Sequence, residues 1–128
     1  MLDIALLPGE YAVCRMVAGS TLPYALSSGL RGADVVTVSW TSDGISVICP
    51  IDRAPAQAVL ETTWRCLRVT APVALAAGSL AALVDPLAEA RVSAVTFSTF
   101  DTDYLLVPTV RLTEGTAALQ RAGHRVTG

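Results

Sequence analysis

Two stretches of the sequence repeat one pattern, and this repeat constrains the fold more than any other feature. Residues 36–50 read VTVSWTSDGISVICP and residues 95–108 read VTFSTFDTDYLLVP. Each contains Val, Thr, an apolar residue and Ser, then a polar turn with Asp, then an apolar run that ends in Pro. Apolar segments on both sides of such a turn are typical of a β-hairpin. The repeat therefore predicts two diverged copies of one supersecondary unit.

The first half of the chain is predicted to consist mainly of strands. Tyr11, Val13 and Val17 alternate along the chain with Ala12, Cys14 and Met16. In 36–40, apolar residues alternate with Thr37 and Ser39. We interpret both segments as strands of period two. Asp43 and Gly44 predict the turn of a hairpin. The segment 22–30 is rich in Gly, Ser and Pro, so we expect no more than a short helix there.

The second half predicts an amphipathic helix after residue 78. Ser79 is its predicted N-cap, and Pro86 predicts a kink because proline lacks a backbone donor. The apolar stripe, spaced at i, i+3, i+4 and i+7, is formed by Leu80, Leu83, Val84 and Leu87. We expect Leu83 and Leu87 to be core positions.

The remaining elements complete the order βαββαβ. A helix is predicted at 113–122, and strands are predicted at 65–69, 92–98, 103–110 and after Gly123. This order is the ferredoxin-like split βαβ unit. We therefore expect an α+β chain of two such units, with antiparallel sheets and helices on one face. The predicted units are 1–62 and 63–128.

The charge pattern excludes a nucleic-acid partner. The nine basic residues are all Arg, are dispersed along the chain and are outnumbered by eleven acidic residues. Hydrophobic residues make up 52% of the chain and charged residues 16%, so some apolar surface is expected to remain for self-association. We predict a homodimer. The longest uncharged run, 69–84, is shorter than a membrane span and contains Pro72 and Gly78, so no membrane partner is expected.

The cysteine pattern favours a reducing compartment. Cys14, Cys49 and Cys66 are odd in number, widely spaced and embedded in apolar runs. No CxxC motif competes with a core role for them. The N-terminus carries Asp3 where a secretion signal needs positive charge. We expect reduced core cysteines in a cytoplasmic protein.

No catalytic, metal or cofactor site is predicted. His124 is the only histidine, and no nucleophile motif accompanies it, so we interpret it as structural or solvated. Asp101 and Asp103 lack the further ligands that a metal site needs. No glycine-rich phosphate loop is present. An enzyme that uses these titratable residues remains a third and weaker hypothesis.

Particular segments of the chain resemble the ACT-domain family of small-molecule regulatory modules. The most specific are PLAEARVSAVTFSTFDTDYLLV (86–107) and WRCLRV (64–69), and looser similarity lies in ALLPGEYAVCRM (5–16) and SWTSDGISVICP (39–50). They are similar to the tandem type found in the cytosolic arginine sensors of the CASTOR group and in bacterial ACT-domain proteins. The resemblance implies a ligand held between two ACT units, by the loop from the first strand into the first helix and by the second strand of a neighbour.

The resemblance also implies the site residues. The loop corresponds to 70–78, and the implied ligand-binding residues are Thr70, Ala71, Gly78, Thr99, Phe100, Thr102 and Asp103. Backbone donors at a helix N-terminus suit an α-carboxylate, and a carboxylate such as Asp103 suits an ammonium or guanidinium group.

Two functions follow from these expectations. The first is a regulatory module that binds an amino acid or related small molecule and acts through self-association or a separate protein partner. The second is a ligand-free ACT dimerisation or interaction protein. Asp101 and Asp103 also have a purely structural interpretation as turn residues that accept local backbone hydrogen bonds.

Overall fold

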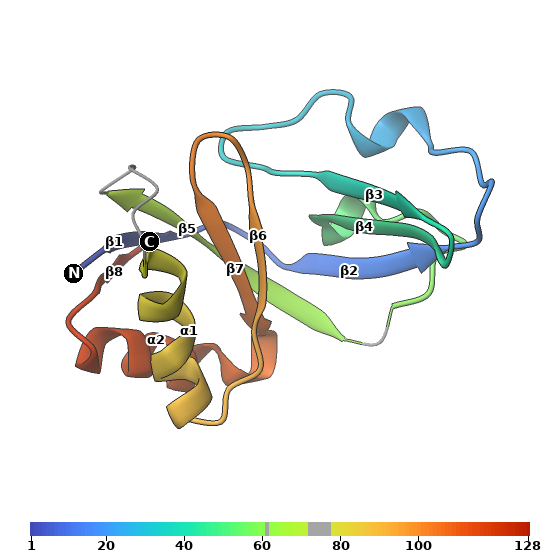
Figure 1. Ribbon diagram of the computed structural model, residues 1–128. Coiled ribbons are helices and arrows are strands. Elements are labelled where there is room, and N and C mark those ends of the chain that lie inside the picture. The colour runs from blue at the N-terminus through green and yellow to red at the C-terminus, as the bar shows by residue number, and fades with distance from the viewer. Residues whose placement is uncertain (61, 72–77) are drawn as a thin grey trace. The chain divides into compact units, whose positions relative to one another are not determined.

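The computed structural model describes residues 1–60, 62–71 and 78–128 (Figure 1). The chain divides into two compact units. Unit 1 consists of Met1–Pro8 and Arg65–Gly128, and unit 2 consists of Gly9–Trp64. The first eight residues thus belong with the C-terminal half, whereas we expected a single boundary after residue 62. The assignment of 1–62 and 63–128 as two ACT-like units stays a prediction.

Unit 1 contains both α-helices of the described chain. Its elements are β1 (Asp3–Leu6), β5 (Thr63–Ala71, whose first two residues belong to unit 2), α1 (Ser79–Glu89), β6 (Val95–Ser98), β7 (Asp103–Pro108), the 3₁₀ turn η3 (Thr109–Arg111), α2 (Leu112–Arg121) and β8 (Arg125–Thr127). From β5 onward this is the predicted βαββαβ order.

The sheet of unit 1 is mixed, so the prediction of purely antiparallel sheets is wrong. The strands follow the order β6-β7-β5-β1-β8. Strand β1 pairs antiparallel with β5 and parallel with β8. The physical reason is that the N-terminal strand inserts between β5 and β8, which are otherwise neighbours in a ferredoxin-like sheet.

The helices cover one face of this sheet and bury the core of unit 1 (Figure 1). Leu83 and Leu87 are 0% and 1% exposed, which confirms both as core positions. Leu80 is 46% exposed and lies outside the buried stripe. The buried core residues are Leu2, Ile4, Leu67, Val69, Leu83, Leu87, Val92, Leu105, Val107, Ala118 and Leu119.

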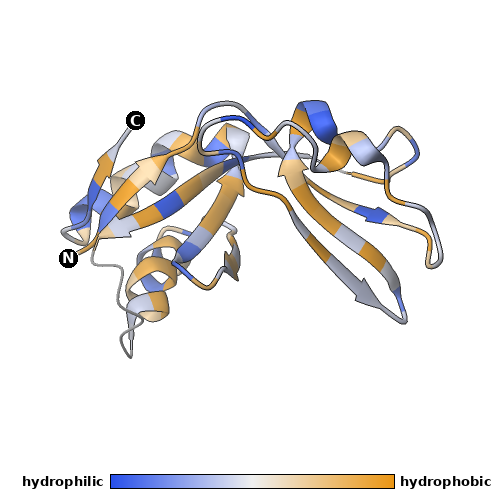
Figure 2. Ribbon diagram, turned by 90° about the horizontal axis from the view of Figure 1, so that it is seen from above, coloured by the Kyte–Doolittle hydropathy of each residue, from blue (hydrophilic) through white to orange (hydrophobic). Residues whose placement is uncertain are grey.

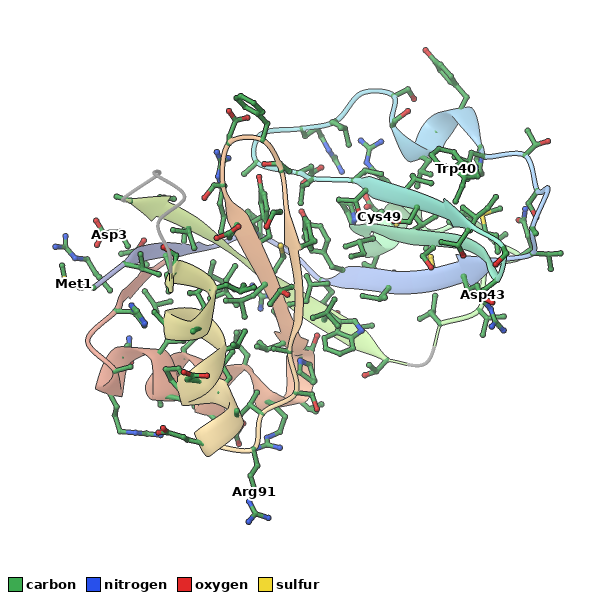
Figure 3. All side chains as sticks on the ribbon, in the orientation of Figure 1. Met1, Asp3, Trp40, Asp43, Cys49 and Arg91 are labelled. Carbon is green, nitrogen blue, oxygen red and sulfur yellow. The ribbon has the colours of Figure 1, made fainter. Side chains whose placement is uncertain are left out.

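Helix α1 begins and ends without side-chain caps. Gly78 occupies the N-cap position with φ 86°, so the prediction of Ser79 as N-cap is wrong by one residue. A left-handed backbone at this point favours glycine. The helix continues through Pro86 to Glu89. The chain then turns at Arg91, which has φ 57° and extends away from the helices (Figure 3).

Unit 2 is a small antiparallel sheet. Its elements are β2 (Tyr11–Met16), η1 (Tyr24–Leu26), β3 (Thr37–Thr41), β4 (Gly44–Pro50) and η2 (Ile51–Arg53). Strand β4 pairs with β2 and β3, and the β3–β4 hairpin turns at Asp43 as predicted. The described residues of unit 2 contain no α-helix, because the Gly-, Ser- and Pro-rich segment 22–30 forms only a three-residue 3₁₀ turn. The described residues of unit 2 therefore lack the α-helices of a complete βαββαβ unit.

Arg53 stabilises the irregular part of unit 2. Its Nη1 atom donates to the carbonyl oxygens of Ala25 and Ser28 at 2.9 and 2.6 Å, and Nη2 donates to that of Gly29 at 2.6 Å. These carbonyl groups follow or belong to the short η1 turn, which leaves them without helical partners. Arg53 is thus a structural residue.

The three cysteines are free and buried, as predicted. Cys14 and Cys49 lie in the core of unit 2, and Figure 3 shows Cys49 on β4. Burial raises the pKa of the Cys49 and Cys66 thiols to about 12, so both are neutral at physiological pH. In the described ranges, no helix is long and apolar enough to cross a membrane.

Candidate functional site

The predicted turn closes the hairpin between β6 and β7. The backbone N–H of Thr99 donates to the carbonyl oxygen of Thr102 at 2.9 Å. The Thr99 hydroxyl oxygen accepts from the backbone N–H groups of Asp101 and Thr102 at 3.3 and 3.4 Å. Ser98 and Asp103 pair at the ends of the two strands. The Thr99 side chain therefore makes the local backbone hydrogen bonds that stabilise a tight turn.

Thr102 connects this turn to β5. Its side chain is buried, and Oγ1 donates to the Val69 carbonyl oxygen at 2.7 Å. Thr70 and Ala71 follow Val69 at the end of β5. The structure thus brings the turn and the end of β5 together, and these are two of the segments that the resemblance implies for a ligand site.

The two turn carboxylates differ in their surroundings. Asp103 is half-buried, and its Oδ1 atom accepts from the Ser98 hydroxyl at 2.6 Å. Ser98 is the only hydrogen-bond partner of this carboxylate among the described residues. Asp101 is exposed. Asp103 therefore has a defined orientation and a second oxygen that can accept from a cationic group.

The loop side of the predicted site is described only at its ends. Thr70 is exposed, and its hydroxyl donates to the Asp3 carbonyl oxygen at 3.2 Å. Ala71 ends β5, and Gly78 precedes α1. Residues 72–77, which make up most of the predicted loop, lie outside the described residues.

An aromatic stack lies beside the turn and was not predicted. The rings of Phe97 and Tyr104 are 4.9 Å apart and nearly parallel, and the Arg68 guanidinium lies 5.7 Å from the Tyr104 ring centre. Phe97 and Tyr104 are opposite each other in the β6–β7 register, which was the available sequence signal. The stack orders the hairpin, whereas Phe100 at its tip is 97% exposed.

His124 links the second helix to the first. Its Nδ1 atom accepts from the Leu2 backbone N–H at 3.1 Å, and its Nε2 atom lies 2.8 Å from the Ala82 carbonyl oxygen. Since Nδ1 accepts, the ring proton lies on Nε2, which donates to Ala82. The usual donor to this carbonyl would be residue 86, and Pro86 has no N–H. Both ring nitrogens are engaged, so His124 is structural, as expected.

A hollow between α1 and α2 was also not predicted. It has a volume of about 640 Å³ and is lined largely by small side chains. Its charged residues are Asp85 and Glu89 from α1 and Arg121 from α2. The described residues, those of the hollow included, contain no cluster of three or more His, Cys, Asp or Glu side chains that could hold a metal ion.

The comparisons with known proteins agree with this geometry. Residues 59–121 match the sequence model of a family described as ACT domain. A search of curated proteins finds no match to the chain.

Solved structures share the fold over nearly the whole chain. Protein Atu0741 from Agobacterium tumefaciens is 28% identical, with a TM-score of 0.86 over 99% of this chain and 93% of that one. VC0802 from Vibrio cholerae, a protein of unknown function and possible transport protein, is 18% identical, with a TM-score of 0.72 over 94% and 89%. The regulatory subunit of aspartate kinase from Thermus flavus is 7% identical, with a TM-score of 0.58 over 93% and 95%. The segment 59–121, which extends from the approach to β5 to the end of α2, therefore carries the ACT-domain similarity.

Proposed function

We propose that this chain is a non-catalytic regulatory module that binds an amino acid or a related small molecule. Binding is transmitted through self-association as a homodimer or through a separate protein partner. The ACT-domain match and the fold shared with a regulatory subunit support this proposal. A cytoplasmic location suits the three free, buried cysteines.

The observation that carries the proposal is the hydrogen bond from Thr102 to Val69. It holds the β6–β7 turn against the end of β5. The carboxylate of Asp103 and the first residue of the 70–78 loop, Thr70, therefore lie at the same end of the strands of unit 1. A site for a small zwitterion needs an acceptor for its cation and donors for its carboxylate.

Unit 1 offers both kinds of group. Asp103 is oriented by Ser98 and supplies a carboxylate acceptor. Helix α1 begins at Ser79 without a side-chain cap, so its first backbone N–H groups are suited to an α-carboxylate. Asp103 is proposed to bind the cationic end of the ligand. Thr70, Ala71, Gly78, Thr99 and Phe100 are proposed to shape the site.

A ligand-free interaction protein is the second candidate. The hydroxyl groups of Thr70, Thr99 and Thr102 all make hydrogen bonds within the chain. To donate to a ligand, the Thr70 and Thr102 hydroxyls would have to give up these internal acceptors. That observation favours a structural role for the turn.

A thermal-melting screen with the common amino acids and related metabolites separates the two candidates. A ligand present at about 100 times its Kd stabilises the folded state by about 2.7 kcal/mol, which raises Tm by several degrees. The regulatory module predicts such a shift with at least one compound. No shift with any compound at millimolar concentration would favour the ligand-free candidate.

Matched variants then test the site itself. Asp103→Asn keeps the size of the side chain but removes its charge, so affinity should fall by about 1.5–3 kcal/mol, roughly 10- to 150-fold. Asp101→Asn is the control and should have a smaller effect because Asp101 is exposed. Isothermal titration with the compound that scores in the screen measures both. Unchanged affinity in Asp103→Asn, or equal losses in the two variants, would remove Asp103 from the ligand site.

A further inference from the structure

The outer face of α1 is unusually apolar for an exposed helix surface. Figure 2 shows apolar colouring along much of this helix. A helix that is apolar on most of its circumference is normally covered by another element. Only two charged residues interrupt the exposed side, whose members are Leu80, Ala81, Ala82, Asp85, Ala88 and Glu89.

The hollow beside this face has walls of opposite charge. Asp85 and Glu89 are one helical turn apart on α1, and Arg121 lies on the α2 side. All three side chains are exposed, and within the described residues none of them forms an ion pair. The small side chains between the walls, such as Ala118 and Ala122, permit another helix to approach closely.

We propose that this α1–α2 face is the contact surface of a homodimer, in which a second copy of the chain presents the same face. The inference rests on the proposed self-association and assigns it to a surface. In a twofold dimer, when one residue of the first copy contacts a different residue of the second, the same contact also forms with the two copies exchanged. In the proposed dimer Arg121 of one copy meets Asp85 and Glu89 of the other, and the twofold symmetry forms the same pairs a second time.

The charge pattern favours a second copy of this chain over a partner of single charge. A strongly basic or strongly acidic partner would meet one wall of like sign, which opposes association. The α1–α2 face of a second copy, related to the first by a twofold axis, can instead place opposite charge against each of the two walls. Helix α1 has 11 residues and is about 16 Å long, so the face is at the small end of specific interfaces. The dimer should accordingly dissociate in the micromolar range.

Charge reversal tests the surface. In a dimer of Arg121→Glu, the new Glu of each copy faces Asp85 and Glu89 of the other. In a dimer of the double variant Asp85→Arg/Glu89→Arg, the two new Arg side chains of each copy face Arg121 of the other. Each variant alone should weaken dimerisation at least about 10-fold, as measured by sedimentation velocity over a dilution series. Gln120→Glu is the control, since Gln120 is exposed on α2 but does not line the hollow, and it should dimerise like the wild type.

Mixing the two charge-reversed proteins gives the decisive result. Both walls are complementary only in the mixed dimer, so an equimolar mixture should regain the wild-type dissociation constant to within about threefold. Recovery also shows that both variants are folded, and circular dichroism of each provides the same check. Arg121→Gln removes the positive charge without adding a negative one, so it should weaken association less than Arg121→Glu.

Three outcomes would overturn the assignment: a wild-type chain that is monomeric at several hundred micromolar, an Arg121→Glu variant that dimerises normally, or folded variants whose mixture shows no recovery. The amino-acid melting screen on Arg121→Glu separates this inference from the proposed function. If Arg121→Glu still shows a rise in Tm with the ligand and still dimerises normally, the proposed ligand binding stands and the dimer contact is not the α1–α2 face.

Discussion

Replacing His124 by Phe tests whether the imidazole substitutes for the donor that Pro86 lacks. In an ordinary helix the N–H of residue 86 would bind the Ala82 carbonyl oxygen, and here Nε2 of His124 does so at 2.8 Å. Phe has a similar ring volume but no hydrogen-bonding nitrogen. The substitution therefore removes the bonds to Ala82 and Leu2 while leaving the packing largely filled.

The magnitude follows from the number of bonds lost. A hydrogen bond within a protein contributes about 0.5–1.5 kcal/mol net, so losing two should lower the free energy of unfolding by about 1–3 kcal/mol. His124 is 7% exposed, which limits replacement of the lost partners by water. Far-UV circular dichroism in urea at pH 7.5 measures the change.

A double-mutant cycle with Pro86→Ala isolates the bond to Ala82. Alanine at position 86 supplies its own backbone N–H to that carbonyl, so Nε2 of His124 becomes redundant there. His124→Phe should then cost only the Leu2 bond, and its effect should be smaller by about 1 kcal/mol than in the wild-type background.

A control and a clear contrary result complete the cycle. Val47 is buried in the core of unit 2, so Val47→Ala should cost the same with Pro86 or Ala at position 86. If His124→Phe costs equally in both backgrounds, or if it costs nothing in either, then the imidazole does not replace the missing amide donor.

Other substitutions address the core, two glycines and one thiol. Leu83 is fully buried, so Leu83→Ala should lower the free energy of unfolding by about 2–5 kcal/mol in urea denaturation, and an unchanged value would contradict its core position. A Cβ atom at Gly44 would lie 2.7 Å from the Met16 carbonyl oxygen at φ 138°, so Gly44→Ala should be destabilising. Gly115→Ala meets only ordinary contacts of 3.6–3.7 Å and should be neutral or stabilising by up to about 1 kcal/mol; thermal melts in the opposite order would refute this contrast. Burial raises the pKa of the Cys66 thiol from 9.0 to about 12. The neutral thiol therefore stabilises the fold below pH about 9, and this contribution is lost between pH about 9 and 12. The free energy of unfolding of Cys66→Ala should therefore fall less steeply with pH over that range than that of the wild type. Equal slopes for the two proteins would argue against a raised pKa for the Cys66 thiol.

Local sequence patterns were sufficient for much of unit 1. The sequence predicts the second helix at 113–122, and it is observed at 112–121. The predicted strands at 92–98 and 103–110 flank the turn between β6 and β7, which are observed at 95–98 and 103–108. Both elements depend on contacts between residues close in the chain, where periodicity and turn chemistry are informative. The buried positions of Leu83 and Leu87 followed from the same helical period.

Contacts between distant parts of the chain could not be predicted. Strand β1 has four residues and no alternation, and its place in the sheet depends on pairing with β5 and β8. Both predicted hairpins form, as β3–β4 and β6–β7. A repeated hairpin does not specify what surrounds it, however, and the segment 22–30 lacks the residues for the helix that a second copy needs.

The candidate site shows the same limit at the level of side chains. The sequence predicts a polar turn around Thr102, and the family resemblance implies that Thr102 and Asp103 bind a ligand. Neither gave a means of knowing that the Thr102 hydroxyl points to the Val69 carbonyl or that Ser98 orients Asp103. Short polar side chains bind backbone, solvent or ligand equally well, and only the folded geometry decides which.

The insertion of β1 between β5 and β8 also determines the order in which the chain can mature during translation. Strand β1 is synthesised first, but its parallel partner Arg125–Thr127 follows only after unit 2 and most of unit 1. At 5–20 residues per second, that interval is on the order of 10 s. Unit 2, in contrast, has all its strand partners once Trp64 has emerged. The nascent chain therefore carries a structured insert while the apolar strand before it still has unpaired edges, and this is the period when chaperones are most needed.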